Sequence, residues 1–288
     1  MKHVIIIPIY NDWKSLNKLL LKLDHSLKNE KKIKNEILLV NDDSSKKLNL
    51  KKKKFKVIKR IKVIFLKKNL GSQKAIAIGL SYLKKLKENF FITVMDSDGE
   101  DDPMQVKKMI KTAARNPNKI ITSNRKQREE PLVIIVLYKL HLIFTFLFTW
   151  KWISFGNFST FNKSNLKRIL SNNHSWYAHS SSVLKNCDIV RLYSKRKKRY
   201  FDKSNLGLLS LIEHSLRVNV VFYKKIFLSS LIYLLIIFTF FEDKLRTLLT
   251  FGIILFNFLN IVILIKHWIN NLANITNYIK KIKLIKKF

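Results

Sequence analysis

Short apolar runs that end in polar clusters recur through the first half of this 288-residue chain, with helical patterns between them. Short continuous strands alternating with helices are typical of an α/β domain with a mostly parallel sheet. The helical patterns lie in residues 13–27, where leucines recur at the spacing of one helix face, in residues 69–86, and after Asp102-Pro103. The expected strands cover residues 1–8, 36–40, 62–66, 90–95 and 120–121.

Three polar clusters follow the first, second and fourth of these strands. They are Tyr10-Asn11-Asp12, Asp42-Asp43-Ser44 and Asp96-Ser97-Asp98. Ligands of open α/β sheets bind beyond the carboxyl ends of the strands. We therefore expect the three clusters to lie close together and to form the ligand site.

The segment Asp96-Ser97-Asp98-Gly99-Glu100 is the sharpest of these features. It places two carboxylates at the end of a strand with little covering bulk. Hard cations such as Mg²⁺ or Mn²⁺ prefer oxygen ligands and usually share them with substrate phosphates. An Asp-x-Asp pair alone is more often a solvated turn or a helix cap, so its weight comes from the other clusters.

The charge of the chain narrows the classes of partner. It has 56 Lys and Arg against 19 Asp and Glu, a formal net charge of +37. Such a balance favours nucleic acid, anionic lipid or phosphorylated small molecules. Because the lysines spread along the whole chain while acidic residues gather at strand ends, we expect no nucleic-acid partner. The single cysteine, Cys187, excludes a disulfide scaffold.

Two long apolar runs occupy the C-terminal part of the chain, Ile226–Phe241 and Thr247–Ile265. A membrane-spanning helix needs roughly 20 such residues. Both outer flanks are basic, whereas the connector Glu242–Arg246 has no net charge. The positive-inside rule then predicts a transmembrane hairpin with both ends in the cytoplasm. The alternative is a pair of buried helices in a soluble domain. We expect Asn257 and Asn260 to face the first helix at Ser229, Ser230 or Thr239, or another subunit, and not lipid.

A third apolar stretch, Leu132–Trp150, contains Lys139 and His141. A charge at mid-depth in a bilayer costs several kcal/mol by some estimates. Spanning would also separate the residues that follow from the acidic clusters. This stretch is therefore expected to be an interfacial helix.

The ordered motifs of the first half resemble those of a known enzyme family. Val4 to Asp12, Leu39 to Ser45, Asn69 to Ala75 and Val94 to Pro103 together resemble family 2 glycosyltransferases with the GT-A fold. The resemblance is closest to the branch that makes dolichol-phosphate or polyprenyl-phosphate sugars. It covers roughly residues 1–225. It implies a nucleotide-sugar donor, a Mg²⁺ or Mn²⁺ cofactor and a polyprenyl-phosphate or other lipid-linked acceptor.

The resemblance also implies roles for the matching residues. Asp96, Asp98 and Arg125 are the implied catalytic residues, and Asp98 and Glu100 the implied metal ligands. The implied nucleotide-sugar pocket consists of Pro8, Tyr10, Asp12, Asp42, Lys74 and Asp96, and the implied acceptor-phosphate group consists of Arg128, Arg199 and Ser204.

Three positions depart from the family pattern. Asp43 and Asp202 stand where glycine is usual, and Asn157 replaces the Asp of a Gly-Asp-Phe type motif. A sugar hydroxyl needs a general base to become nucleophilic, whereas a phosphate is already anionic at neutral pH. The amide at Asn157 therefore favours a phosphate acceptor, with Asp101 and Asp102 as alternative bases.

Together these observations predict a membrane-anchored α/β glycosyltransferase with a GT-A, Rossmann-like domain and a C-terminal hairpin in the inner or plasma membrane. It moves a sugar to a polyprenyl phosphate with inversion; the alternative is transfer to a hydroxyl of a lipid-linked or surface glycan. A degenerate transferase that scaffolds a partner is a further alternative, and homo-oligomer formation is left open. The expected segments are a nucleotide-sugar-binding core at 1–130, an interfacial helix and acceptor-side segment at 131–225, two transmembrane helices at 226–265 and a basic cytoplasmic tail at 266–288.

Overall fold

The computed structural model describes residues 1–28, 30, 33–50, 55–125, 132–194, 197–201, 207–268 and 272–287. The chain divides into two compact units. The sheet unit comprises residues 1–128, 155–204 and 272–288, and the helical unit comprises residues 129–154 and 205–271. Residues 131–225, which the sequence suggests as one segment, are thus shared between the two units.

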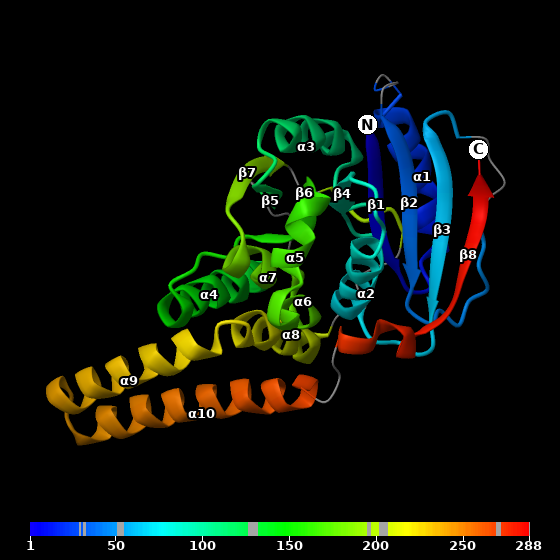
Figure 1. Cartoon of the computed structure of the whole chain (residues 1–288). Coiled ribbons are helices and arrows are strands. Elements are labelled where there is room, and N and C mark those ends of the chain that lie inside the picture. The colour runs from blue at the N-terminus through cyan, green and yellow to red at the C-terminus, as the bar shows by residue number, and fades with distance from the viewer. Residues whose placement is uncertain are drawn as a thin grey trace. The chain divides into compact units, whose positions relative to one another are not determined.

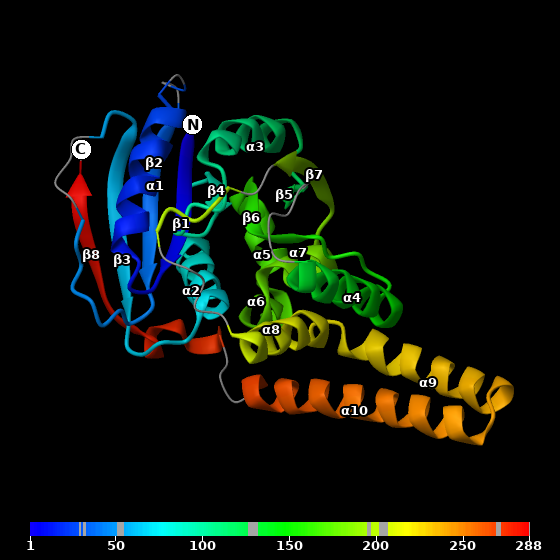
Figure 2. The ribbon, with the colours of Figure 1, turned by 180° about the vertical axis from the view of Figure 1, so that it is seen from behind.

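The sheet unit is built on one eight-stranded mixed sheet in the order β7-β5-β6-β4-β1-β2-β3-β8 (Figures 1 and 2). Strands β4, β1, β2 and β3 run parallel, as the sequence predicts, and β6 and β8 pair antiparallel with their neighbours. The strands are β1 (Lys2–Ile9), β2 (Lys34–Asn41), β3 (Ile58–Leu66), β4 (Phe91–Val94), β5 (Ile120–Arg125), β6 (Phe155–Asn162), β7 (Ile189–Ser194) and β8 (Ile279–Lys287).

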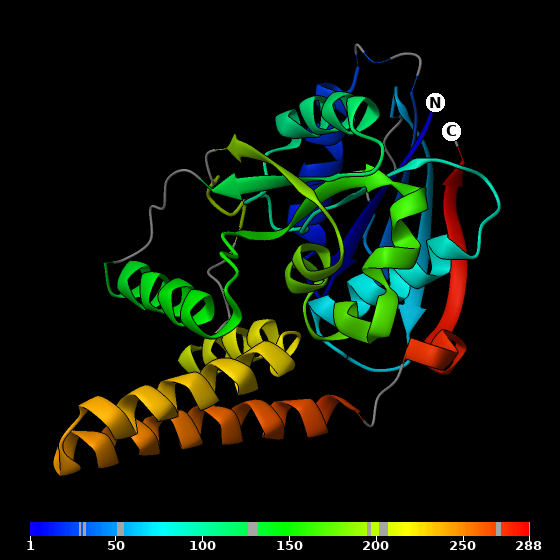
Figure 3. The same ribbon diagram turned by 60° about the vertical axis from the view of Figure 1, so that its left-hand side comes forward.

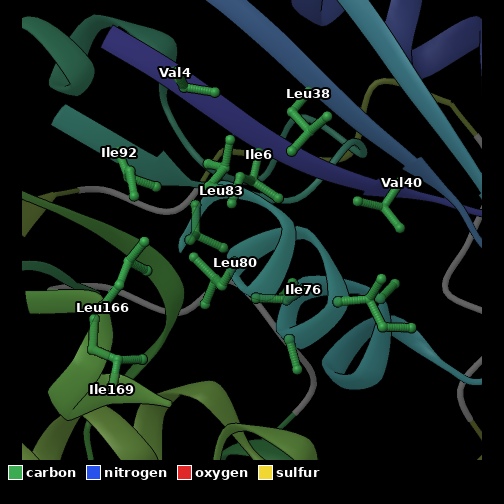
Figure 4. Packing of buried hydrophobic residues seen from close by; sticks show 14 of the residues in the cluster. Val4, Ile6, Leu38, Val40, Ile76, Leu80, Leu83, Ile92, Leu166 and Ile169 are labelled. Atoms are coloured by element: carbon green, nitrogen blue, oxygen red, sulfur yellow. The ribbon is translucent and has the colours of Figure 1, made fainter. Parts of the chain in front are cut away.

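Helices cover both faces of this sheet because the central strands are apolar on both sides. On β1, Val4 and Ile6 pack with α2, while Ile5, Ile7 and Ile9 pack with α1 and α3. Figure 4 shows the α2 side of this core. The helices are α1 (Trp13–Ser26), α2 (Ser72–Lys84), α3 (Pro103–Arg115), α5 (Leu166–Ile169), α6 (His174–Tyr177) and α7 (His179–Asn186), with 3₁₀ turns at Lys163–Asn165, Ser171–Asn173 and Leu272–Asn277.

The end of the chain is part of the sheet. The sequence suggests a basic tail at 266–288, but Ile279–Lys287 forms β8 and pairs with the edge strand β3. Ile279 packs against one core cluster and Ile285 against the other, whereas the lysines between them are more exposed. Lysines interspersed with apolar residues suit an edge strand, because the charges discourage pairing with another chain.

The helical unit contains α4 (Leu132–Thr149), α8 (Leu208–Val220), α9 (Tyr223–Phe240) and α10 (Asp243–Trp268). Helices α9 and α10 run side by side as a hairpin (Figure 3). Among the described residues, these two are long and apolar enough to cross a membrane, with mean hydropathies of 1.6 and 2.6. Asn257 Nδ2 donates to Ser230 Oγ at 2.8 Å, which confirms the expected contact of Asn257 with the first helix. Asn260 is buried, and its amide donates to the Phe256 carbonyl of its own helix at 2.8 Å.

Candidate active site

The three polar clusters lie at one edge of the sheet. Asp12 follows β1, Asp42 follows β2 and Asp96 follows β4, and β1 pairs in parallel with both β2 and β4. The register aligns Ile9 with Asn41. The expectation that these clusters come together is therefore confirmed.

Hydrogen bonds join the first two clusters. Asn11 N–H donates to Ser44 Oγ at 2.9 Å, and Asn11 Oδ1 accepts from Lys46 N–H at 2.9 Å. Asn11 and Asp43 both have left-handed backbones, with φ of 57° and 55°. Asp and Asn tolerate this conformation better than most residues. Asp43 can therefore stand where the family pattern has glycine.

Asp42 fixes the loop that precedes α2. Its carboxylate accepts from Leu70 N–H and from Gly71 N–H, both at 2.8 Å, and the residue is 3% exposed. Burial raises the pKa of this carboxyl, and the two backbone hydrogen bonds act in the opposite direction. Lys74 is buried nearby, with its ammonium 5.1 Å from the centre of the Trp176 ring. The contacts of Asp42 and Lys74 with a donor remain predictions.

The Asp96–Glu100 segment forms a tight loop beyond β4. Asp96 N–H donates to Asp101 Oδ2 at 3.0 Å, and Glu100 N–H donates to Asp98 Oδ1 at 3.0 Å. Gly99 turns the chain with φ of +89°. Burial, followed by the nearby charges of Asp96 and Glu100, raises the pKa of Asp98 to about 6. The loop therefore concentrates negative charge in a poorly hydrated place.

Residues 197–201 lie against this acidic loop. Lys197 N–H donates to the Glu100 carbonyl at 3.0 Å, and Tyr200 N–H donates to the Asp98 carbonyl at 2.9 Å. The Arg199 guanidinium is 3.3 Å from Asp98 Oδ2 and 3.9 Å from Asp12 Oδ2. Arg199, which the family resemblance assigns to an acceptor phosphate, is thus the counter-ion of two acidic clusters in this structure.

The two alternative bases are both held by local contacts. Asp101 is 6% exposed and accepts from Asp96 N–H. Asp102 caps α3 by accepting from Met104 N–H at 3.1 Å, and its Oδ2 lies 3.6 Å from Lys197 Nζ. Asn157 Nδ2 donates to the two oxygens of Asp96 at 3.1 and 3.4 Å. No carboxylate occupies the position of the family's Asp.

The other expected site residues have varied settings. Pro8 is buried within β1 opposite Val40, and Tyr10 is 51% exposed beyond the end of that strand. Asp12 also caps α1 by accepting from Ser15 N–H at 3.2 Å. Arg125 ends β5, but the position of its side chain is not described, and Arg128 and Ser204 lie outside the described residues.

The acidic loop fits a cation that is shared with a substrate. Among the described residues, no group of three or more His, Cys, Asp or Glu side chains is arranged to hold a metal ion. Mg²⁺ and Mn²⁺ sites in phosphate-binding enzymes commonly use one or two carboxylates and complete the shell with water and phosphate oxygens. Burial and the neighbouring charges of Asp96 and Glu100 raise the pKa of Asp98 although Arg199 lies beside it, and a divalent cation bound there would act in the opposite direction.

The sequence gives no role to Gln73 or Tyr200, and it favours a structural or surface role for His179. Gln73 belongs to a motif that carries the family resemblance, but its partners come from β6 and α7. Gln73 Nε2 donates to Asn157 Oδ1 at 3.0 Å. Tyr200 covers Gly99 so closely that a Cβ on that glycine would lie 2.4 Å from the ring.

Comparisons with known proteins agree on the fold. The model of glycosyl transferase family 2 matches residues 4–181. A search of curated proteins found no match. Among solved structures, glucosyl-3-phosphoglycerate synthase from Mycobacterium tuberculosis, in complex with Mn²⁺, UDP and phosphoglyceric acid, is 11% identical with a TM-score of 0.50, and the match covers 78% of each chain.

Two further solved structures are similar to this chain. Mannosyl-3-phosphoglycerate synthase from Rubrobacter xylanophilus is 13% identical with a TM-score of 0.49, and the match covers 78% of this chain and 74% of that chain. TarS from S. aureus (residues 1–349) is 16% identical with a TM-score of 0.40, covering 78% and 71%. Because the family model matches more than half of the sequence, this chain belongs to glycosyl transferase family 2 and has the GT-A fold.

Proposed function

We propose that this glycosyltransferase moves a sugar from a nucleotide sugar to a polyprenyl phosphate, with inversion, at the cytoplasmic face of a membrane. The observation that carries the proposal is the state of the carboxylates near Asp96. Asp101 and Asp102 are engaged in local structure, and an amide occupies position 157. Among the described residues near Asp96, Asp101 and Asp102 are already engaged, so a hydroxyl acceptor finds no unengaged base there, whereas a phosphate needs none.

Each acidic cluster has a part in this reaction. Asp42 and the neighbouring Lys74, with Pro8, Tyr10 and Asp12, form the nucleotide pocket. Asp96 orients the donor, and Asp98 and Glu100 hold a divalent cation. When bound, such a cation neutralises charge on the diphosphate leaving group.

The basic residues receive the acceptor. Arg199 lies beside Asp98, so a phosphate bound by its guanidinium would be close to the donor's anomeric carbon. Arg125, Arg128 and Ser204 complete the phosphate contacts in this proposal. The adjacent Lys197 is exposed and adds positive charge on the same segment.

The connectivity of the chain supports a membrane hairpin. The chain leaves the sheet unit after residue 204 and returns to it at residue 272, where it goes on to form β8. Both ends of the α9–α10 pair must therefore be on the same side of a membrane, as the basic flanks predict. A single crossing by α4 is incompatible with the sheet, because β5 before it and β6 after it pair with each other.

A transfer assay tests the proposal. Membranes that contain the full chain are incubated with a panel of labelled nucleotide sugars, with undecaprenyl phosphate, and with MnCl₂ or EDTA. We expect a lipid product that is labile to mild acid, and none from the Asp98→Asn variant. An acid-stable glycoside would instead support the hydroxyl acceptor, and no transfer of any sugar would contradict the proposal.

A further inference from the structure

A chain of amide hydrogen bonds leads from α7 to Asp96. The backbone N–H of His179 donates to Gln73 Oε1 at 2.8 Å. Gln73 Nε2 donates to Asn157 Oδ1 at 3.0 Å, and Asn157 Nδ2 donates to Asp96. Four segments far apart in sequence, at the ends of α7, α2, β6 and β4, thus contribute one residue each.

The two ends of this chain of hydrogen bonds fix the orientation of both amides. A backbone N–H can only donate, so Gln73 must turn its oxygen toward His179 and its nitrogen toward Asn157. Asn157 must then accept from Gln73 and turn its own nitrogen toward Asp96. The Asp96 oxygens accept this last bond, so donors and acceptors alternate along the hydrogen-bond chain from His179 to Asp96.

Because these residues are buried, disturbing this arrangement of donors and acceptors costs free energy. Gln73 is 4% exposed and His179 is fully buried. The imidazole of His179 contributes to placing the backbone, because its Nε2 lies 2.8 Å from Ser159 Oγ on β6. In a desolvated place, an unpaired polar group loses its hydrogen bonds to water and gains nothing in return.

We propose that Gln73 and Asn157 are positioning residues that hold the Asp96 carboxylate in a fixed plane for the donor. The role of Asp96 toward the donor rests on the proposed function, whereas the polarity of the amide chain does not. Gln73 does not need to touch the donor or Asp96, because it acts through the orientation of the Asn157 amide. If position 157 carried an aspartate, as in the family's Gly-Asp-Phe motif, its carboxylate would lie against that of Asp96 and the two negative charges would repel each other.

The isosteric change Gln73→Glu tests the polarity directly. The introduced carboxylate can still accept from His179 N–H, and it can accept from Asn157 Nδ2 if that amide turns over. The turned amide then presents its oxygen to Asp96, and the two acceptors repel. Asp96→Asn should relieve this conflict, because the amide introduced at position 96 can donate to the turned Asn157 oxygen. The residue type at position 73 is thus coupled to the residue type at position 96.

Thermal unfolding of the ligand-free full chain in detergent measures this coupling. We expect Gln73→Glu to lower the melting temperature by about 3–6 °C, and the double variant Gln73→Glu/Asp96→Asn to recover most of that loss. Asn165→Asp is the matched control, because Asn165 is also buried and its amide donates to Pro117 O, outside this chain of hydrogen bonds. Asp96→Asn should not rescue that variant. Additive effects of Gln73→Glu and Asp96→Asn would overturn the proposed polarity.

Titration calorimetry with UDP and MnCl₂ then connects the amide chain to the donor site. Gln73→Glu should weaken binding of UDP at least about tenfold, whereas Asn165→Asp should leave it within about twofold. Unchanged affinity in Gln73→Glu would refute the positioning role. If the unaltered chain binds no UDP while the unfolding experiment still shows the coupling, the proposed donor function fails and the polarity of the amide chain stands.

Discussion

Gly99 offers a sharp test of how residues 197–201 are held against the acidic loop. Its φ of +89° is unfavourable for any residue with a Cβ, and a Cβ there would lie 2.4–2.5 Å from three atoms of the Tyr200 ring. Gly71 has a similar φ of +87° but nothing within 4 Å of its Cβ position. The two glycines therefore separate backbone strain from the clash with Tyr200.

The expected losses of stability come from backbone strain and from the clash with Tyr200. Backbone strain at a positive φ costs about 1–3 kcal/mol for a residue other than glycine, and both Gly71→Ala and Gly99→Ala carry such strain. Overpacking against Tyr200 adds about 1–3 kcal/mol to Gly99→Ala only. The Tyr200 ring cannot withdraw freely, since Tyr200 N–H donates to the Asp98 carbonyl and Lys22 Nζ lies 4.6 Å from the ring centre.

Thermal unfolding of the full chain, followed by tryptophan fluorescence, measures both variants. We expect Gly99→Ala to be less stable than Gly71→Ala by about 1–3 kcal/mol. In a Tyr200→Ala background this difference should disappear, because the clashing ring is gone. Equal losses in the two glycine variants, or a difference that survives Tyr200→Ala, would refute the placement of Tyr200 over the acidic loop.

Three further predictions concern charge and the hairpin. Asp98→Asn should lower transfer by about 10²-fold or more in the labelled-donor assay while leaving melting temperature at pH 7 unchanged or higher; an active variant would remove Asp98 from the mechanism. Because the pKa of Asp98 rises from 3.8 to about 6 on folding, its contribution to stability is present below pH 4 and is lost as the pH rises through 6. The metal-free chain should therefore gain up to about 3 kcal/mol from this group between pH 7 and pH 4, and Asp98→Asn should lack that gain in pH-dependent unfolding. A cysteine placed in the Glu242–Arg246 connector should react with an impermeant thiol reagent only from the outer face; labelling from the cytoplasmic face alone would contradict the hairpin.

Local sequence was sufficient to predict the central strands and the acidic edge of the sheet. The apolar runs that became β1, β2 and β4 are continuous because helices bury both faces of the sheet, and parallel pairing then brings their carboxyl ends to one edge. The place of Asp12, Asp42 and Asp96 follows from this rule alone. The lengths of the last two apolar runs likewise determined helices α9 and α10, since composition and length are local properties.

Only the tertiary structure decided which distant segments complete the sheet and the site. Strand β8 is rich in lysine, which by itself predicts a solvated tail, and it becomes ordered because β3 offers an unpaired edge far away in sequence. Gln73 meets Asn157, which lies 84 positions away, and Arg199 reaches both Asp12 and Asp98 from outside their motifs. Which distant residues become partners depends on packing and on the need to satisfy buried polar groups. Neither of these can be read from the residue spacing within a single segment.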